Sequence, residues 1–195
     1  MTSIPTLDLS RLLLPIQDDD HVRPMSELPV TLVEYGDYQC PDCGRLFVEL
    51  EKLQSELNIA FRLAFRHYPL SGIHPQAQIA AEAAEAASAQ DRFWEMHDLL
   101  FRNQSALRKK DLARYGEQLG LDMNRFNDEM KHHVHAERVR KQFKLGVQNG
   151  VYTTPGLFVN GVRFSKPVDA ITPHVKALIS NLADEPRPES LATAQ

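Results

Sequence analysis

The two cysteines of the chain constrain its fold more than any other feature, because they stand together in one short motif, Cys40-Pro41-Asp42-Cys43. They are the only cysteines among 195 residues. A β-branched and apolar run over residues 30–35 precedes the motif and predicts a buried strand. Four leucines follow the motif at helical spacing: Leu46, Leu50, Leu53 and Leu57. The pair is therefore expected where a strand ends and a helix begins.

The start of a helix favours ionisation of the first cysteine and a disulfide between the two. Pro41 suits the first helical turn, where its missing N–H would have no helical partner. The free amides and the helix dipole at that end favour a thiolate on Cys40, which predicts a pKa below the free-thiol value of about 8.5. A three-residue step to Cys43 on the same face puts the two Cα atoms about 5–5.5 Å apart. This spacing suits a disulfide that opens and closes with little backbone movement.

The composition of the chain restricts the cellular compartment and the kinds of partner that we expect. A hydrophobic content of 43%, a charged content of 25% and a net charge of −4 are typical of a globular domain and give no reason to expect nucleic acid. No export signal is visible after Met1, and no apolar run is long enough to span a bilayer. The sequence therefore predicts a cytoplasmic location and no membrane partner. Cytoplasmic thiols are kept reduced, so a cysteine pair there is more often catalytic or metal-binding than structural.

The remaining segments predict one domain over residues 30–182, with an N-terminal lead-in arm over 1–29 and a disordered tail over 183–195. An acidic run in the arm, Asp18-Asp19-Asp20, is expected to be solvated. Residues 58–68 alternate in apolar character and predict a second strand, parallel to the first. From about 75 to 150, apolar stripes at helical spacing predict an all-helical block. Thr154-Pro155 then leads into a hairpin marked by Asn160-Gly161, and a last helix follows.

Taken together, these motifs resemble the DsbA-like thiol–disulfide oxidoreductases of the thioredoxin-fold superfamily. The similarity covers residues 30–182 and is carried by three segments: LVEYGDYQCPDCG (32–44), FRHYPL (65–70) and TTPGLFVNG (153–161). It implies an α/β thioredoxin-like fold with an all-helical insertion, at about 75–150, between the second strand and the cis-proline hairpin.

The resemblance also implies a role for each candidate site residue. Cys40 resembles the attacking cysteine of the family and Cys43 the resolving one. Thr154-Pro155 resembles the cis-proline loop, whose backbone pairs with the substrate chain. Glu34 resembles the buried acid that moves protons to and from the second cysteine.

The activity implied is disulfide exchange. The Cys40 thiolate attacks a substrate disulfide, a mixed disulfide forms, and Cys43 resolves it. The expected partners are protein or small-thiol disulfide substrates and a thiol/disulfide recycling partner, with no metal or organic cofactor. Asp42 stands where strongly oxidising members have histidine, and its charge beside the Cys40 thiolate would make the disulfide a weaker oxidant. The expected direction is therefore reductase or isomerase rather than oxidase.

Two alternative functions stay open at this point. A redox-inert module would bind extended peptides at Thr154-Pro155 and would be silent in an insulin-reduction assay. A glutathione-dependent isomerase of the kappa-class type is the other alternative. Its members often carry serine at the attacking position, so Cys40 counts against it.

Individual residues have alternatives as well. The cysteine pair could be inert, or could bind zinc together with two of three clustered histidines, His132, His133 and His135. Pro155 could be an ordinary trans turn proline. Glu34 could be a carboxylate exposed to water at a strand end.

Overall fold

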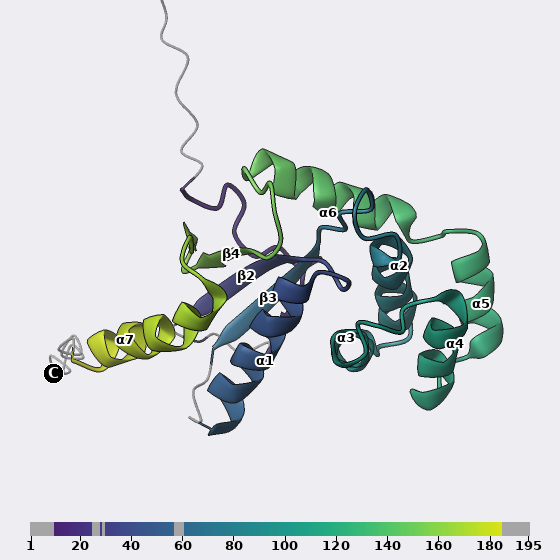
Figure 1. Cartoon of the computed structure of the whole chain (residues 1–195), viewed down its shortest axis with the longest axis horizontal. Coiled ribbons are helices and arrows are strands. Elements are labelled where there is room, and N and C mark those ends of the chain that lie inside the picture. The colour runs from purple at the N-terminus through teal and green to yellow at the C-terminus, as the bar shows by residue number, and fades with distance from the viewer. Residues whose placement is uncertain (1–9, 25–27, 29, 57–60, 185–195) are drawn as a thin grey trace, which may run out of the picture.

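A five-stranded sheet forms the centre of the computed structural model, which describes residues 10–24, 28, 30–56 and 61–184. The strands lie in the order β1-β3-β2-β4-β5 (Figure 1) and comprise His21–Arg23 (β1), Thr31–Gly36 (β2), Arg62–His67 (β3), Gly156–Val159 (β4) and Val162–Arg163 (β5). β2 and β3 are parallel, as the strand–helix–strand pattern predicts. The other neighbouring strands pair antiparallel.

The helices confirm the all-helical insertion. Helix α1, Pro41–Glu56, connects β2 to β3. Between β3 and β4 the chain forms α2 (Ala77–Ser88), α3 (Phe93–Arg102), α4 (Lys109–Gln118), α5 (Met123–Lys131) and α6 (Ala136–Gln148). A 3₁₀ turn, Val168–Ala170, and helix α7, Ile171–Asp184, complete the fold. Figure 1 shows α2 to α5 beside one end of the sheet, with α6 returning across it.

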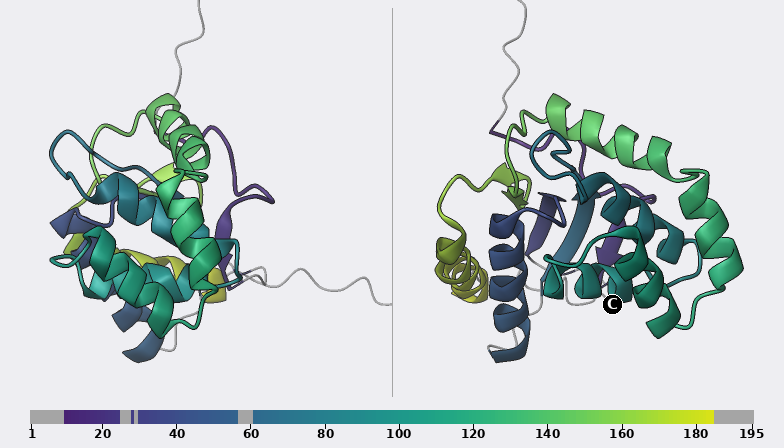
Figure 2. Two further views of the ribbon diagram at one scale, coloured as in Figure 1. Left: turned by 90° about the vertical axis from the view of Figure 1, so that its right-hand side faces the viewer. Right: turned by 45° about the vertical axis from the view of Figure 1, so that its right-hand side comes forward.

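Strand periodicity divides the core of the sheet into two layers, because successive side chains point to opposite faces. One face is covered by α1 and α7, which lie next to each other (Figure 2), and it carries Leu32, Leu63 and Leu157. The opposite face, which α6 covers, carries Val33, Ala64 and Phe158. Glu34 lies two residues after Leu32 and therefore shares the α1 face, which places a carboxyl group beneath the helix that carries the cysteines.

The lead-in arm contributes a strand to the sheet, which the sequence did not predict. β1 pairs antiparallel with β3 at the edge. Further upstream, Leu12 N donates to Gly161 O at 2.8 Å, and Leu13 N donates to Asn149 Oδ1 at 2.6 Å. At the other end, α7 continues to Asp184, into the tail expected over 183–195. The rest of that tail lies outside the described residues, as do residues 1–9 of the arm.

The acidic run of the arm is solvated only in part, which corrects the prediction for Asp20. Asp18 and Asp19 are exposed, but the Asp20 side chain is only 5% exposed. Its carboxylate accepts from Arg66 Nε at 2.8 Å and from Arg66 Nη2 at 2.6 Å. Arg66 is fully buried and also donates from Nη1 to Tyr35 Oη at 2.8 Å. The sequence alone does not predict this pair, because its members stand 46 residues apart.

We expect Arg66→Ala to lower the free energy of unfolding by about 3–5 kcal/mol, because it leaves the Asp20 carboxylate buried without its counter-charge. Chemical denaturation monitored by circular dichroism measures the loss. The matched control is Arg92→Ala, which removes an exposed pair with Glu95, whose side chains are 52% and 44% exposed. That control should cost less than about 1 kcal/mol. Similar losses in the two variants would contradict a specific role for the buried pair.

Candidate active site

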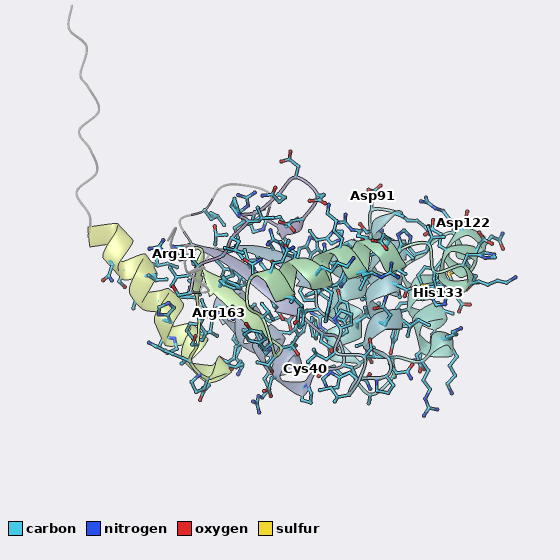
Figure 3. The ribbon with its side chains drawn as sticks, turned by 90° about the horizontal axis from the view of Figure 1, so that it is seen from above. Arg11, Cys40, Asp91, Asp122, His133 and Arg163 are labelled. Atoms are coloured by element: carbon cyan, nitrogen blue, oxygen red, sulfur yellow. The ribbon has the colours of Figure 1, made fainter. Side chains whose placement is uncertain are left out.

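The cysteine pair lies at the start of α1, as the sequence predicts. Cys40 directly precedes the helix; its N–H donates to Asp37 O at 3.1 Å, and its carbonyl accepts from Gly44 N at 3.1 Å. Both cysteines are free thiols and both are buried, with Cys40 6% exposed and Cys43 fully enclosed. Figure 3 places Cys40 near the edge of the molecule. The protein is therefore described in its reduced state, with one sulfur nearer the surface than the other.

The pKa of Cys40 is lowered from the ordinary thiol value of 9.0 to about 6. The largest cause is the hydrogen bond from the Cys43 thiol, which outweighs the opposing effect of burial. The Thr154 side chain and the backbone amides of Cys43 and Asp42 lower the pKa further. The direction agrees with the prediction from the helix terminus. The neighbouring thiol, however, contributes more than the amides of the first helical turn.

Cys43 has the opposite character. Burial is the main reason that its pKa lies well above the ordinary value, and the Cys40 side chain and the charge of Glu34 act in the same direction. A backbone N–H, from Asp37, approaches Cys43 Sγ at 3.5 Å. At neutral pH the pair therefore combines a thiolate on Cys40 with a buried, protonated thiol on Cys43.

Glu34 lies beneath the pair and is buried, with 2% of its surface exposed. Burial is the main cause that raises its pKa from 4.5 to about 8, and negative charge on Cys40 adds to the effect. Its Oε1 has no hydrogen-bond partner among the described residues. The structure therefore favours the buried acid over the exposed carboxylate. A carboxyl group that titrates near neutral pH beside a thiol of high pKa is suited to exchange protons with it.

The Thr154-Pro155 loop faces the cysteines through a cis peptide bond, so the trans alternative is wrong. Cys40 Sγ lies 3.4 Å from Thr154 O, which accepts a hydrogen bond from it when the thiol is protonated. Thr154 is 4% exposed. A cavity of about 340 Å³ opens between this loop and the first turn of α1, with Asp42 and Pro155 in its lining. A second cis bond, Arg23–Pro24, lies at the end of β1 and was not predicted.

The Asp42 side chain is half exposed and pairs with an arginine. Its carboxylate pairs with Arg45 Nη2 at 2.7 Å, and the side chain is 51% exposed. Its charge is not among the causes that set the pKa of Cys40; only its backbone amide is. Solvent and Arg45 therefore weaken the like-charge repulsion that the sequence predicted.

Asp37 is a site residue that the sequence analysis missed. It is 1% exposed, and its Oδ1 accepts from Gln39 N at 2.8 Å. Its Oδ2 accepts from Leu70 N and pairs with His74 Nδ1, both at 2.8 Å. The carboxylate thus joins the turn before the cysteines to the segment after β3. A short acid between a strand and a helix is a recognisable turn signal, but its long-range partners are not.

The zinc alternative finds no support in the positions of the histidines. Each of the three pairs with a nearby acid instead: His132 with Asp128, His133 with Glu82 and His135 with Glu129. Figure 3 shows His133 in the insertion, well away from Cys40. Within the described ranges, the only cluster with metal-ligand geometry is His21, His67 and Glu85, and it contains no cysteine.

That cluster is held by two hydrogen bonds, and an ion pair joins Arg138 to it. His21 Nε2 and His67 Nε2 lie 2.9 Å and 3.0 Å from Glu85 Oε1, and Arg138 Nε pairs with Glu85 Oε2 at 2.7 Å. The Nδ1 of His67 is buried with no partner among the described residues, and burial lowers the pKa of this ring. A neutral ring with an unpartnered Nδ1 carries its proton on Nε2, which then donates to the carboxylate and has no lone pair for a metal. The network ties β1, β3 and α6 to α2.

Fold and site together define a class: a thioredoxin-fold protein with a dithiol of unequal acidity at the start of a helix, facing a cis-proline loop. Residues 17–177 match the family model Thioredoxin_4, whose description is thioredoxin. The chain belongs to this family of DsbA-like thioredoxin-fold proteins.

The curated relatives are longer proteins. The chain is 45% identical to "Na(+)/H(+) antiporter NhaA 3" of Salinispora tropica over 80% of its own length and 24% of that protein. It is 41% identical to "Na(+)/H(+) antiporter NhaA 1" of Salinispora arenicola, over 90% and 27%. The chain thus spans about a quarter of the length of these relatives. In the part of the chain that the structure describes, no helix has the length and apolar character needed to cross a bilayer.

Solved structures confirm the fold. Oxidised BdbD from Bacillus subtilis superposes with a TM-score of 0.70 at 22% identity, over 82% of this chain and 92% of that one. The thiol-disulfide exchange protein α-DsbA2 of Wolbachia pipientis gives a TM-score of 0.63 at 19% identity, over 76% and 81%. At such identities the likeness concerns the fold, which is the predicted α/β thioredoxin-like fold with a helical insertion between β3 and β4.

Proposed function

We propose that the protein is a thiol–disulfide oxidoreductase that cycles Cys40 and Cys43 between dithiol and disulfide. The observation that carries this proposal is the opposed acidity of the two thiols: the Cys40 pKa is lowered to about 6, and that of Cys43 is raised. Exchange needs a thiolate that attacks and a second thiol that stays protonated until the mixed disulfide has formed. The site provides both within one helical turn.

The reaction balances as a two-electron exchange. The Cys40 thiolate attacks one sulfur of a substrate disulfide, the substrate S–S bond breaks, and the other substrate sulfur leaves as a thiolate. The mixed disulfide removes the negative charge of Cys40 that had helped to raise the pKa of Glu34, so part of Glu34 loses its proton to water. The Glu34 carboxylate then takes the proton of Cys43, and Cys43 attacks Cys40 Sγ. The second substrate sulfur leaves, so the substrate is reduced by two electrons and the protein is oxidised to the Cys40–Cys43 disulfide.

Protein or small-thiol disulfides are the proposed substrates, and a thiol/disulfide recycling partner restores the dithiol. An insulin-reduction assay tests the proposal: the protein should accelerate the reduction of insulin by dithiothreitol. Silence in this assay, together with silence in the reverse oxidation of a reduced peptide, would favour the redox-inert peptide-binding module. A cytoplasmic location stays a prediction, which cell fractionation with an antibody against the chain would check.

We propose the reductase or isomerase direction, on the ground that an acid stands between the cysteines where strong oxidants have histidine. Asp42→His should lower the pKa of Cys40 and make the couple more oxidising. A charge in the first helical turn is worth about 0.3–1 kcal/mol, so the equilibrium with glutathione should move by about two- to fivefold. The pair with Arg45 places the expected change toward the low end.

The measurement for Asp42→His is the thiolate absorbance near about 240 nm as a function of pH, with equilibration against glutathione. Asp42→Asn is the control that removes the charge without adding a ring. It should shift both quantities in the same direction. A Cys40 pKa that is unchanged or higher in both variants would contradict the electrostatic argument.

A further inference from the structure

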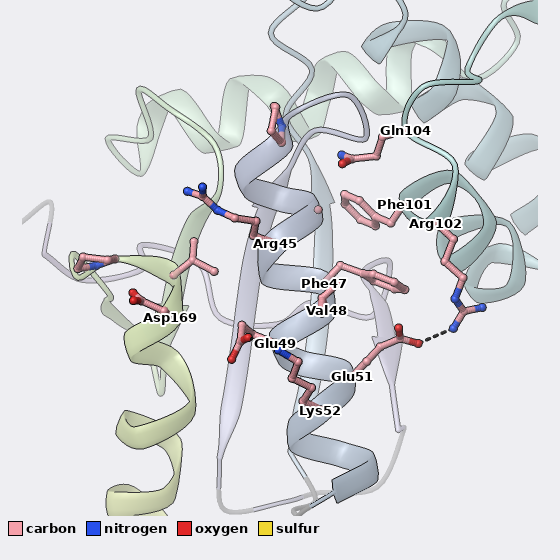
Figure 4. A pocket seen from close by; sticks show the side chains of 14 residues that line it. Arg45, Phe47, Val48, Glu49, Glu51, Lys52, Phe101, Arg102, Gln104 and Asp169 are labelled. Carbon is pink, nitrogen blue, oxygen red and sulfur yellow. Dashed lines mark hydrogen bonds and ion pairs between the residues drawn. The ribbon is translucent and has the colours of Figure 1, made fainter.

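A glutamine from the helical insertion contacts the backbone that carries the cysteines. Gln104 lies in the turn after α3, and its Nε2 donates to Tyr38 O at 3.0 Å and to Cys40 O at 2.8 Å. The two acceptors stand 66 and 64 residues before it in the chain. Figure 4 shows its amide directed at the first turn of α1. One side chain thus fixes the carbonyls on both sides of Gln39.

The amide can approach this closely because of a glycine. A Cβ added to Gly44 would lie 2.2 Å from Gln104 Oε1 and 2.7 Å from its Cδ, far inside van der Waals contact. Glycine is unfavourable inside a helix relative to alanine, so its presence one residue after Cys43 calls for a local reason. The close packing of the Gln104 amide supplies that reason.

The contact bears directly on the reactive sulfur. The Cys40 carbonyl also accepts from Gly44 N and begins the hydrogen bonding of α1. Hydrogen bonds to this carbonyl restrict the ψ torsion of Cys40, and so restrict where its Cα–Cβ bond places Sγ relative to the amides of Asp42 and Cys43. Gln104 also lines a pocket of about 850 Å³ along α1 (Figure 4), so its outer side is accessible from that pocket.

We propose that Gln104 is a positioning residue for the cysteine pair: it holds the Cys40 backbone in the orientation in which the sulfur reacts, and Gly44 leaves the space that this contact needs. The inference deepens the proposed function, because it names the residue through which the helical insertion controls the dithiol. Gln104 touches neither sulfur and acts through the Cys40 carbonyl.

The first test is Gln104→Ala, followed by titration of the Cys40 thiolate near about 240 nm and equilibration with glutathione. Loss of the contact should raise the Cys40 pKa and destabilise the reduced form. The couple should become more reducing by about fivefold, the factor that one hydrogen bond of typical strength represents. Gln104→Met keeps the length of the side chain but lacks its hydrogen-bond donors, so it should shift the Cys40 pKa in the same direction. It provides the test if the alanine variant folds poorly.

The second test is a double-mutant cycle with Gly44→Ala. The added methyl group should displace the Gln104 amide and reproduce the shift of Gln104→Ala. In the Gln104→Ala background the same methyl group meets no amide, so it should add no further shift. The two substitutions should therefore be strongly non-additive in the Cys40 titration.

The matched control is Gln90→Ala. Gln90 makes the same kind of side-chain contact within the insertion, with Nε2 3.4 Å from Asp122 O and Oε1 2.7 Å from Asp122 N. Asp122 lies far from Cys40 in Figure 3. This control should leave the Cys40 titration unchanged, even where it lowers the free energy of unfolding.

The proposal is overturned if Gln104→Ala and Gln104→Met titrate like the wild type, or if they only lower the stability. Additive effects of Gly44→Ala and Gln104→Ala would overturn the role of Gly44. Titration needs no substrate, so its outcome is separate from the proposed activity. A wild type that fails to reduce insulin but shows the expected non-additive shifts would contradict the proposed function and leave the positioning role intact.

Discussion

Cys40→Ser is expected to abolish disulfide exchange. The serine hydroxyl has no accessible anion at neutral pH, whereas the Cys40 thiol is largely ionised, with a pKa of about 6. Cys43 cannot replace it, because its sulfur is fully enclosed and its pKa is raised by burial. Insulin reduction should fall to the uncatalysed rate. Retention of most of the activity would refute the assignment of Cys40 as the attacking residue.

Cys43→Ser is the complementary variant and should trap mixed disulfides, because attack survives while resolution does not. Mass spectrometry after incubation with a peptide disulfide should find the peptide attached to Cys40. Serine keeps a donor hydroxyl at position 43, whereas Cys43→Ala removes the hydrogen bond that contributes most to the low pKa of Cys40. The trapped species should therefore form more slowly in Cys43→Ala than in Cys43→Ser, most clearly below neutral pH. The double variant, with serine at both positions, should trap nothing.

Glu34→Gln should slow the resolution of the mixed disulfide by about a hundredfold, the low end of general acid–base contributions. Glu34 is a buried carboxyl beside Cys43 with a pKa of about 8. Loss of the Cys40 charge in the mixed disulfide favours the ionised form of Glu34, which can take the proton that Cys43 loses. The first attack, by a Cys40 already ionised, should change little. Stopped-flow kinetics with a peptide disulfide separates the two steps. Equal slowing of both steps, or of neither, would contradict the proton-transfer role.

The same variant predicts a change in stability with pH. The folded carboxyl of Glu34 keeps its proton up to about pH 8, whereas its ordinary pKa is 4.5. Between these values the folded state binds more protons than the unfolded state, so stability falls as pH rises. Glu34→Gln should lack this part of the decline, so its free energy of unfolding relative to the wild type should rise between about pH 4.5 and about pH 8 and stay constant at higher pH. A parallel pH dependence in both proteins would show that the carboxyl is not desolvated.

Local sequence patterns predicted most of the fold. The apolar run before the cysteines, the helical leucines after them and the Asn160-Gly161 turn each act over a few residues, so they can be recognised without a structure. The same holds for the five helices of the insertion. The motifs also pointed to Cys40, Cys43, Thr154-Pro155 and Glu34, and the structure brings these residues together at one end of the sheet.

The tertiary structure alone decided how the site is tuned. Burial and distant partners set the acidity of each thiol, and neither can be deduced from a motif: Thr154 stands 114 residues from Cys40, and Gln104 stands 64. The same is true of Asp20, which looked solvated until the fold placed Arg66 against it. The effect of the nearby Asp42 on Cys40 also depends on the folded structure, in which its carboxylate pairs with Arg45 and is exposed to solvent. Sequence determines which groups are present, but the electrostatic effect of a group depends on its neighbours and on its exposure to water, and only the folded chain fixes both.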